Sequence, residues 1–587
     1  MSRSLLLVLG WALALLPAAC HSQDSAEEKR SQPANWATKL ADAYPSAELE
    51  VYTFTFSKKA KENERTAALL QACKRQAAHI LHFCEQGQDR SPGPVAVKIF
   101  ASVEEKGLAL ENTQPVQVLW QKPALAIVSS PYFGEAQLGP QNAVLLRRLL
   151  GQPATMLLED GLSVYFNPQW QYKGHQRWAG RLLYQNNLPP LLELLGAERR
   201  QSTSPLVYRA AAASFTQYLL EQWGREVFLK RYTGWAPEPA AVSTLERGWH
   251  RWLQPHAKAP PQQTASLPYL KGFNFAHEGY SIFNGYGSGY AAEALEKQQR
   301  LGANAVAIVP YSYMRNPRQP SPFPIMRRAG TETDEGVVRD ALMAQELGMK
   351  VVLKPQIWLG GGHWPGDVEM HSPEDWAAFF QHYYRWMRHY ALLAEIYGMD
   401  MLCVGVEFAK ATQQQPQQWV DLIGKLRGIY SGPMTYAANW GAEFEALSFW
   451  PHLDYIGLDC YYPLSTAEQP SDAALRQAFA KKLEEAKRIA LQADRPFLLT
   501  EIGFTSTPAP WQSPHKDGRG KLYNGTTQKR CYDICMEVLS ESGDWQRGIL
   551  WWKFPSDLSE GGSTHTGFTP NDKPAEALLP RWFSKLP

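Results

Sequence analysis

Two glutamates stand where apolar stretches of the chain end, Glu407 in "VGVEF" and Glu501 in "LLTEIGF". A carboxylate in such a place is costly unless it faces a polar cavity or a partner. Hydrolysis of a glycosidic bond needs two carboxyl groups, one that protonates the leaving oxygen and one that attacks or stabilises the anomeric carbon. A lone glutamate at a strand end is more often a solvated surface residue, so this chemistry requires a fold that brings the two together.

The sequence around these glutamates alternates between stretches with the hydrophobic pattern of a strand and stretches with that of a helix. Short apolar runs predict strands at 271–276, 305–310, 350–358, 401–408, 434–439, 455–462, 497–504 and 548–554. Amphipathic helical patterns lie between them, and Gly302, Gly348 and Gly398 are placed as helix stops before the next strand. Apolar strands alternating with helices indicate a parallel sheet covered by helices, and eight such units predict a (β/α)8 TIM barrel of the α/β class.

A TIM barrel carries its site at the C-terminal ends of its strands. Glu407 ends the fourth predicted strand and Glu501 the seventh, so we expect them to face each other across the barrel mouth. Other strand-end residues expected on the same face are Lys354, Tyr461, Trp551, Trp552 and Lys553. Because neighbours on a strand point to opposite faces, one of the two adjacent tryptophans must point out of the barrel.

Seven segments together resemble glycoside hydrolase family 113: "KGFNFAHEGY", "VVLKPQIWLGGGHW", "VGVEF", "DYIGLDCYYPL", "LLTEIGF", "LWWKF" and "GFTPNDKPAEALL". The resemblance covers residues 268–587. It implies a retaining β-glycosidase with Glu407 as the acid/base and Glu501 as the nucleophile, and a β-1,4-mannan or manno-oligosaccharide as substrate. The alternatives are a glycosidase acting on another β-glycan and a non-hydrolytic carbohydrate-binding surface lipoprotein.

In that role Glu407 must hold a proton near neutral pH, which an apolar setting and the negative charge of Glu501 would favour. Glu501 must stay ionised, and a hydrogen bond from Tyr461 would help. The residues that we expect to bind substrate are Lys354, Trp358, Asn439, Tyr461 and Trp552. The mechanism needs no metal and no cofactor.

Composition narrows the classes of partner. The chain has 587 residues and a formal net charge of +2, so nothing points to nucleic acid as a partner, and its 21 tryptophans suit sugar binding as well as core packing.

Six of the seven cysteines are expected to be small hydrophobic side chains rather than disulfide partners. The seventh, Cys20, ends "PAAC" after the apolar run of an export signal at residues 1–20. It resembles a lipidation site, so residues 21–35 would be a linker from a membrane tether, in a periplasmic or cell-surface protein; plain secretion is the alternative.

The front part, residues 36–255, is expected to be a separate, smaller α+β domain, joined by a linker at 256–267 to the barrel at 268–587. Its order of elements and the segment "LLEDGLSVYF" are similar to the gluzincin type of metallopeptidase fold. Leu146 to Leu150 stand in the place of that fold's His-Glu-x-x-His, and Asp160 in the place of the third ligand. Since leucine cannot bind zinc, we expect a spacer or a module that binds an unknown protein or glycan. An unrelated α/β domain is the alternative.

Overall fold

The computed structural model describes residues 51–62, 65–84, 94–120, 124–196, 203–263, 266–277 and 281–587. The predicted signal peptide, Cys20 and the linker at 21–35 lie outside these residues and remain predictions. No helix in the described ranges is long and apolar enough to cross a membrane.

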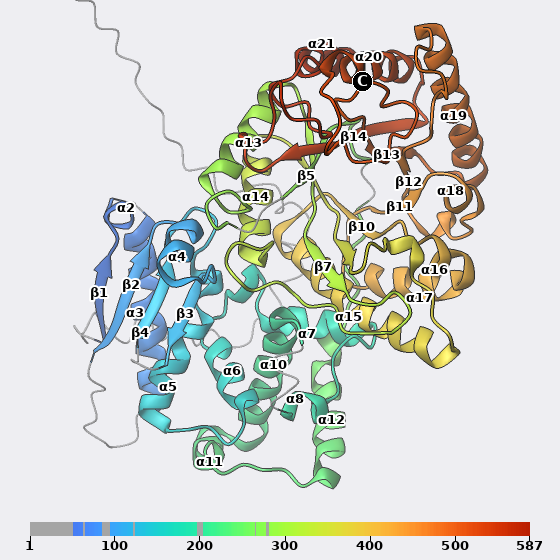
Figure 1. Ribbon diagram of the computed structural model, residues 1–587. Helices are drawn as coiled ribbons and strands as arrows, with labels where there is room; N and C mark the ends of the chain where they lie inside the picture. The colour runs from blue at the N-terminus through green and yellow to red at the C-terminus, as the bar shows by residue number, and fades with distance from the viewer. Residues whose placement is uncertain are drawn as a thin grey trace, which may run out of the picture. The chain divides into compact units, whose positions relative to one another are not determined.

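Eight strands of the described chain close into a barrel, which confirms the predicted fold (Figure 1). In ring order they are β5 (Leu270–Ala276), β6 (Ala305–Ile308), β8 (Lys350–Leu353), β10 (Met401–Val406), β11 (Met434–Asn439), β12 (Tyr455–Cys460), β13 (Phe497–Ile502) and β14 (Gln546–Pro555). All eight pairs of neighbouring strands in the ring are parallel. Every residue of β10, β12 and β13 is buried, as expected of strands with side chains inside the barrel on one face and helices on the other.

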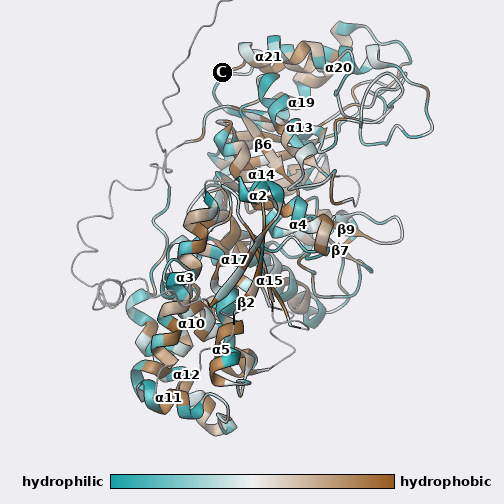
Figure 2. Cartoon of the chain, turned by 90° about the vertical axis from the view of Figure 1, so that its left-hand side faces the viewer, coloured by the Kyte–Doolittle hydropathy of each residue, from teal (hydrophilic) through white to brown (hydrophobic). Residues whose placement is uncertain are grey.

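The helices begin and end where the sequence signals indicate. They include α13 (Gly289–Arg300), α14 (Asp334–Glu346), α15 (Pro373–Tyr397), α17 (Pro416–Arg427), α19 (Asp472–Ala493) and α20 (Gly525–Ser540). Ser372 caps α15 by accepting a hydrogen bond from the Asp375 N–H, and Gly398 ends that helix with a φ of 62°. Gly302 and Gly348, at φ of 92° and 77°, likewise follow α13 and α14. Teal and brown stretches alternate along helices such as α3 in Figure 2, as on helices with one buried face.

One predicted strand is wrong in its extent. The run at 350–358 is two strands, β8 and β9 (Gln356–Leu359), separated by Lys354 and Pro355. Proline has no N–H to continue the barrel ladder, and β9 instead pairs in parallel with β7 (Tyr311–Met314) as a separate two-stranded ribbon. Strand β7 was not among the predicted strands.

The front part of the described chain has a four-stranded sheet in the order β1 (Tyr52–Phe56), β2 (Val95–Phe100), β4 (Ala124–Val128) and β3 (Val116–Leu119), with β3 antiparallel. The predicted strands at β1 and β2 and the predicted helix at α3 (Arg65–Cys84) are present. The segment "LLEDGLSVYF" forms α6 (Met156–Tyr165), which crosses α10 (Pro205–Trp223). A Cβ on Gly161 would lie 2.5 Å from the Ala212 carbonyl oxygen, so this glycine allows close helix packing.

The position expected for a zinc helix holds an ion pair. Arg147 in α5 (Asn142–Leu150) pairs with Glu159, whose side chain is buried, while Leu146 lies in the core. Among the described residues no group of three or more His, Cys, Asp or Glu side chains is placed to hold a metal ion. The likeness to a peptidase fold stays a prediction.

Contacts join the front part to the barrel helices. Arg181 pairs with Glu395 with both side chains buried, and the Ser204 hydroxyl lies 2.8 Å from Nδ1 of His389. Residues 51–587 form one compact unit. The boundaries at 36–255, 256–267 and 268–587 remain predictions.

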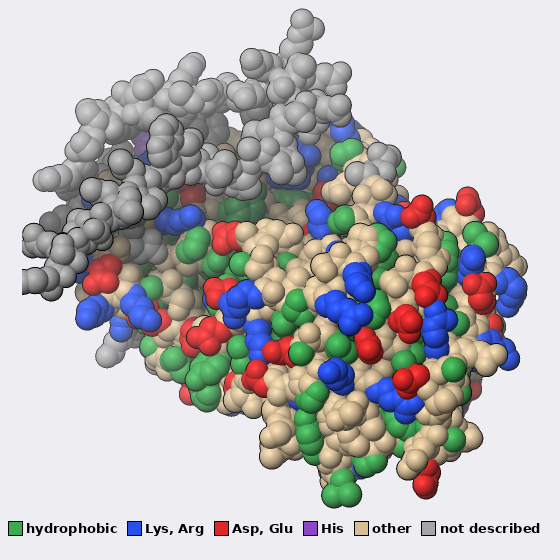
Figure 3. Space-filling model, turned by 90° about the horizontal axis from the view of Figure 1, so that it is seen from above, with side chains coloured by type: hydrophobic (Ala, Val, Ile, Leu, Met, Phe, Trp, Pro, Cys, Tyr) green, Lys and Arg blue, Asp and Glu red, His purple; other side chains and the backbone are tan. Residues whose placement is uncertain are grey.

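The surface and the cysteines agree with a weakly charged globular chain. On the described atoms of the face in Figure 3, lysine and arginine are interspersed with aspartate and glutamate, and neither sign forms a large area. The six described cysteines are free, and all but Cys84 are buried.

Candidate active site

Glu501 lies near the end of β13, buried, with donors on both carboxylate oxygens. The Lys354 ammonium contacts Oε1, and the Gln356 side-chain amide donates to the same oxygen over 3.0 Å. The Tyr461 hydroxyl donates to Oε2 over 2.7 Å. An ammonium and two hydrogen-bond donors therefore surround this side chain and hold both of its oxygens. Lys354 and Tyr461 were both predicted for this face, and both contact the predicted nucleophile.

Glu407 follows directly on β10 and has the opposite environment. No described side chain donates a hydrogen bond to its carboxylate, which is half-buried. Burial raises its pKa well above the usual range, and the negative charges of Asp459, Glu501 and Glu443 raise it further, against the opposing effect of Lys354. Both effects favour the protonated carboxyl group, which is the form that a general acid requires.

The backbone at Glu407 is held in an unusual conformation. Its φ is 56°, a region that favours glycine, and strain of this kind clusters at functional sites. The Glu407 N–H donates to the Ala437 carbonyl over 2.9 Å, which keeps the residue in register with β11. The next N–H, of Phe408, donates to the Tyr436 hydroxyl, which in turn donates to Glu443 over 2.7 Å.

Glu443 is a buried support for this turn. Besides Tyr436, it accepts hydrogen bonds from the Thr412 hydroxyl at 3.0 Å and the Asn439 N–H at 2.7 Å. Burial raises its pKa to about 7, while these three hydrogen bonds lower it. The residue therefore ties β11 to the chain that follows Glu407.

A third carboxylate lies beneath the pair. Asp459 on β12 is fully buried and in register with Glu501. Its Oδ1 accepts a hydrogen bond from the Thr500 hydroxyl at 2.7 Å and lies 3.5 Å from the Lys354 ammonium, so Lys354 serves two carboxylates. Burial and the charge of Glu501 raise the pKa of Asp459 to about 8, and Lys354 lowers it. Asn274 on β5 completes the cage, with its Oδ1 3.3 Å from the same ammonium.

The other predicted substrate-binding residues lie at the same strand ends. Asn439 ends β11 and is in register with Asp459. Trp552, on β14, is half-buried and in register with Asn274. Trp551 points outward, because its ring stacks on Tyr532 of α20 at a centroid distance of 3.7 Å. Trp358 lies on β9, with its side chain exposed.

Sequence reasoning missed Asp459, Gln356, Asn274 and Glu443. A signal existed for three of them, since Asp459 interrupts the apolar strand "YIGLDC" and Gln356 follows "LKP". Asn274 sits at the middle of "GFNFA" with the same polar-in-apolar pattern. Nothing local marks Glu443, whose partners are two residues of β11 and Thr412.

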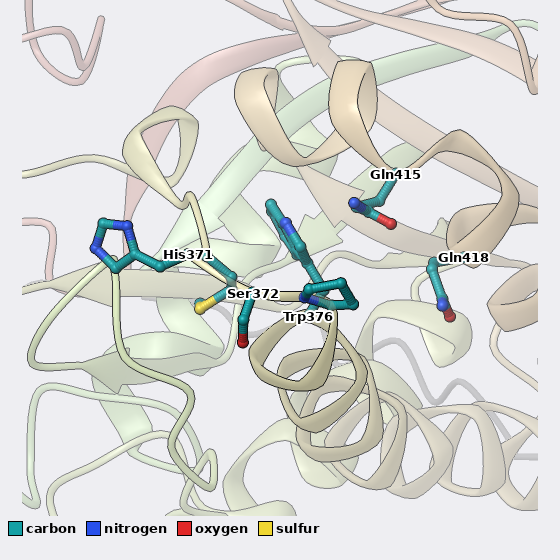
Figure 4. A pocket seen from close by; sticks show the side chains of 7 residues that line it. His371, Ser372, Trp376, Gln415 and Gln418 are labelled. Carbon is teal, nitrogen blue, oxygen red and sulfur yellow. The ribbon is translucent and has the colours of Figure 1, made fainter.

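A cavity of about 440 Å³ lies elsewhere, at the start of α15 (Figure 4). Its lining residues are Met370, His371, Ser372, Pro373, Trp376, Gln415 and Gln418. Neither Glu407 nor Glu501 lines it, so this cavity is not the candidate active site. The candidate active site is identified by its arrangement of charges and hydrogen-bond donors.

A parallel eight-stranded barrel with two carboxylates at the ends of β10 and β13 defines the class of TIM-barrel glycosidases. The model of Glycoside Hydrolase Family 113 matches residues 278–573. This match spans half of the chain, and the chain therefore belongs to that family and is a glycoside hydrolase.

Three solved structures to which this chain is similar are described by identity, TM-score and coverage. The GH113 β-mannanase AaManA from Alicyclobacillus acidocaldarius, in complex with ManMIm, is 25% identical, with a TM-score of 0.48 over 54% of this chain and 98% of its own. A GH113 β-1,4-mannanase is 23% identical, with a TM-score of 0.48 over 54% and 99%. A β-glucuronidase from Ruminococcus gnavus is 18% identical, with a TM-score of 0.38 over 54% and 50%. No curated protein matches the chain.

Proposed function

We propose that the protein is a retaining β-glycoside hydrolase that acts on β-1,4-mannan or manno-oligosaccharides. Membership of family 113 supports a glycoside hydrolase, and the resemblance of its motifs to that family implies the substrate. The observation that carries the mechanism is the contrast between its two glutamates. Glu501 is surrounded by donors, whereas Glu407 receives none from the described side chains.

In the first step Glu501 attacks the anomeric carbon with a carboxylate oxygen. The bond from that carbon to the leaving oxygen breaks, and Glu407 transfers its proton to the leaving oxygen. Glu501 is now an ester and Glu407 is ionised. In the second step Glu407 takes a proton from water, whose oxygen attacks the anomeric carbon and releases Glu501. The product keeps the β configuration.

Lys354, Gln356 and Tyr461 fix the nucleophile in this scheme. Three donors on two oxygens leave the carboxylate little rotational freedom, and a held geometry lowers the entropic part of the barrier. Asp459 and Asn274 hold Lys354 from the other side. Asn439 and Trp552 lie where they can contact the sugar.

The test is a substrate screen. Purified protein is incubated with mannan, manno-oligosaccharides, xylan and cello-oligosaccharides, and products are identified by chromatography and by NMR of the first-formed anomer. We expect β-anomeric products from mannan or its oligosaccharides. Hydrolysis of xylan or cello-oligosaccharides alone would favour another β-glycan. A wild-type protein that binds glycan without cleaving it, with Glu501→Gln binding equally well, would favour a non-hydrolytic carbohydrate-binding role.

We also propose that the protein is exported and tethered through a lipid on Cys20, with the front part as a non-catalytic module that binds another protein or a glycan. The support is the sequence of residues 1–20 and the leucines Leu146 and Leu150 at the expected positions of the zinc-binding histidines. Metabolic labelling with radioactive palmitate tests the tether. We expect label in the wild type and none in Cys20→Ser, and equal labelling would refute it.

A further inference from the structure

The ribbon formed by β7 and β9 has one buried face and one open face. Side chains alternate along both strands, as strand geometry requires. The buried face consists of Ser312, Met314, Ile357 and Leu359. The open face consists of Tyr311, Tyr313, Gln356 and Trp358. The ribbon therefore sits on the protein through one side and presents the other.

One end of the open face contacts the proposed nucleophile, Glu501. The Gln356 side-chain amide donates to Glu501 over 3.0 Å, so this end of the ribbon belongs to the active site. Trp358 is two residues further along the same strand and on the same face, which places it about 7 Å beyond Gln356. The ribbon thus leads away from the reaction centre by about the length of one sugar unit.

Two aromatic residues stand on neighbouring strands at that distance. Tyr313 is the register partner of Trp358, and adjacent strands are about 4.8 Å apart. Tyr313 is 47% exposed and Trp358 is 65% exposed. A single exposed aromatic residue is ordinary, but these two share the open face whose other end contacts Glu501. Aromatic rings offer a large, rigid face for flat apolar partners at low entropic cost.

We propose that Tyr313 and Trp358 form an aromatic platform that stacks a second pyranose ring of the substrate, next to the ring held at Glu501. The C–H face of a β-linked pyranose is flat and apolar, and it suits an aromatic face while its hydroxyls remain in water. This inference rests on the proposed function and deepens it. A platform beyond the reaction centre makes the enzyme select oligosaccharides over single glycosides.

Tyr313→Ala and Trp358→Ala test the platform, because the removed rings are exposed and the fold should persist. Tyr184→Ala is the matched control, since Tyr184 is 45% exposed on α7 (His175–Tyr184) in the front part. Each variant is assayed on β-mannosyl fluoride, which fills only the reaction centre, and on mannopentaose. Thermal unfolding checks that each variant is folded.

For each platform variant we expect kcat/KM on mannopentaose to fall about two- to tenfold, the range for one aromatic stacking contact. The loss on mannopentaose should exceed any loss on β-mannosyl fluoride, Tyr184→Ala should behave as wild type on both substrates, and Trp358→Phe should retain most of the activity. Equal loss on both substrates, or no loss on either, would overturn the platform. Wild-type protein inactive on both substrates would instead overturn the proposed function.

Discussion

Lys354→Met removes the cation shared by two buried carboxylates. In the native site the Lys354 ammonium is fully buried, contacts Glu501 and lies 3.5 Å from Asp459. Methionine has nearly the same length and fills the same space, so the change removes charge with little loss of packing. Breaking a buried ion pair by removing one partner costs about 3–5 kcal/mol. We expect the free energy of unfolding at pH 7 to fall by that amount.

Lys350→Met is the matched control, because Lys350 lies on the same strand at its other end. It pairs with Asp400 over 2.9 Å, but its side chain is 40% exposed. Exposed pairs contribute about 0–1 kcal/mol, since water and salt screen them. Urea denaturation of both variants and of the wild type, followed by tryptophan fluorescence, gives the three values.

The pH dependence separates charge from packing. Without the ammonium, the carboxyl group of Asp459 has a pKa further above its unfolded value than the value of about 8 that it has beside Lys354. A group whose pKa is raised by folding lowers stability increasingly as pH rises above its unfolded value, about 4 for a carboxyl group. Wild-type Asp459 ionises in the folded state near pH 8, whereas Asp459 of the variant stays protonated to higher pH. The deficit of Lys354→Met should therefore grow between pH 7 and pH 9. A deficit equal to that of Lys350→Met, or one that is the same at both pH values, would refute this reasoning.

Three further changes have expected outcomes. Tyr461→Phe removes a hydrogen bond to an oxygen of Glu501. A hydrogen bond to a charged group is worth about 1.5–3 kcal/mol, and we expect steady-state assays to show kcat/KM reduced about 10- to 100-fold. An unchanged rate would contradict the contact. Glu407→Gln removes the general acid and should lower kcat on manno-oligosaccharides about 10²- to 10⁴-fold. The first step should stay fast on a dinitrophenyl β-mannoside, whose leaving group needs no proton. Equal losses on the two substrates would contradict the role of Glu407. Glu443→Gln removes a negative charge that raises the pKa of Glu407. In a plot of kcat/KM against pH, the alkaline limb should therefore move to lower pH. An alkaline limb that stays in place or moves to higher pH would contradict this electrostatic effect.

The barrel was predictable because each strand and helix carries its own signal. Buried parallel strands appear as short apolar runs, and glycines such as Gly398 mark helix ends. The strand split at Lys354 and Pro355 was not predicted, although proline within an apolar run is a warning against a continuous strand. The front part was predictable only in its first strands and helix, because its later helices pair in ways that depend on tertiary packing.

Within the site, the sequence is informative where one residue type at a strand end has one chemical use. The expectation that Glu407, Glu501, Lys354 and Tyr461 lie at one end of the barrel follows from such placement, and their roles remain predictions. Asp459 and Glu443 are buried carboxylates whose partners are distant in sequence: Lys354 is 105 positions from Asp459, and Thr412 is 31 from Glu443. Only the closed barrel brings these partners together, so the support of the site could not be derived from local patterns.

The central claim is that Glu501 forms a covalent bond to the sugar. Incubation with a 2-deoxy-2-fluoro-β-mannosyl fluoride should slow the second step and trap the ester, which intact and peptide mass spectrometry can locate. We expect one fluoromannosyl group per chain, on the peptide that contains Glu501, and none in Glu501→Gln. A label on another residue, or no label while the enzyme still turns over mannan with inverted products, would contradict it.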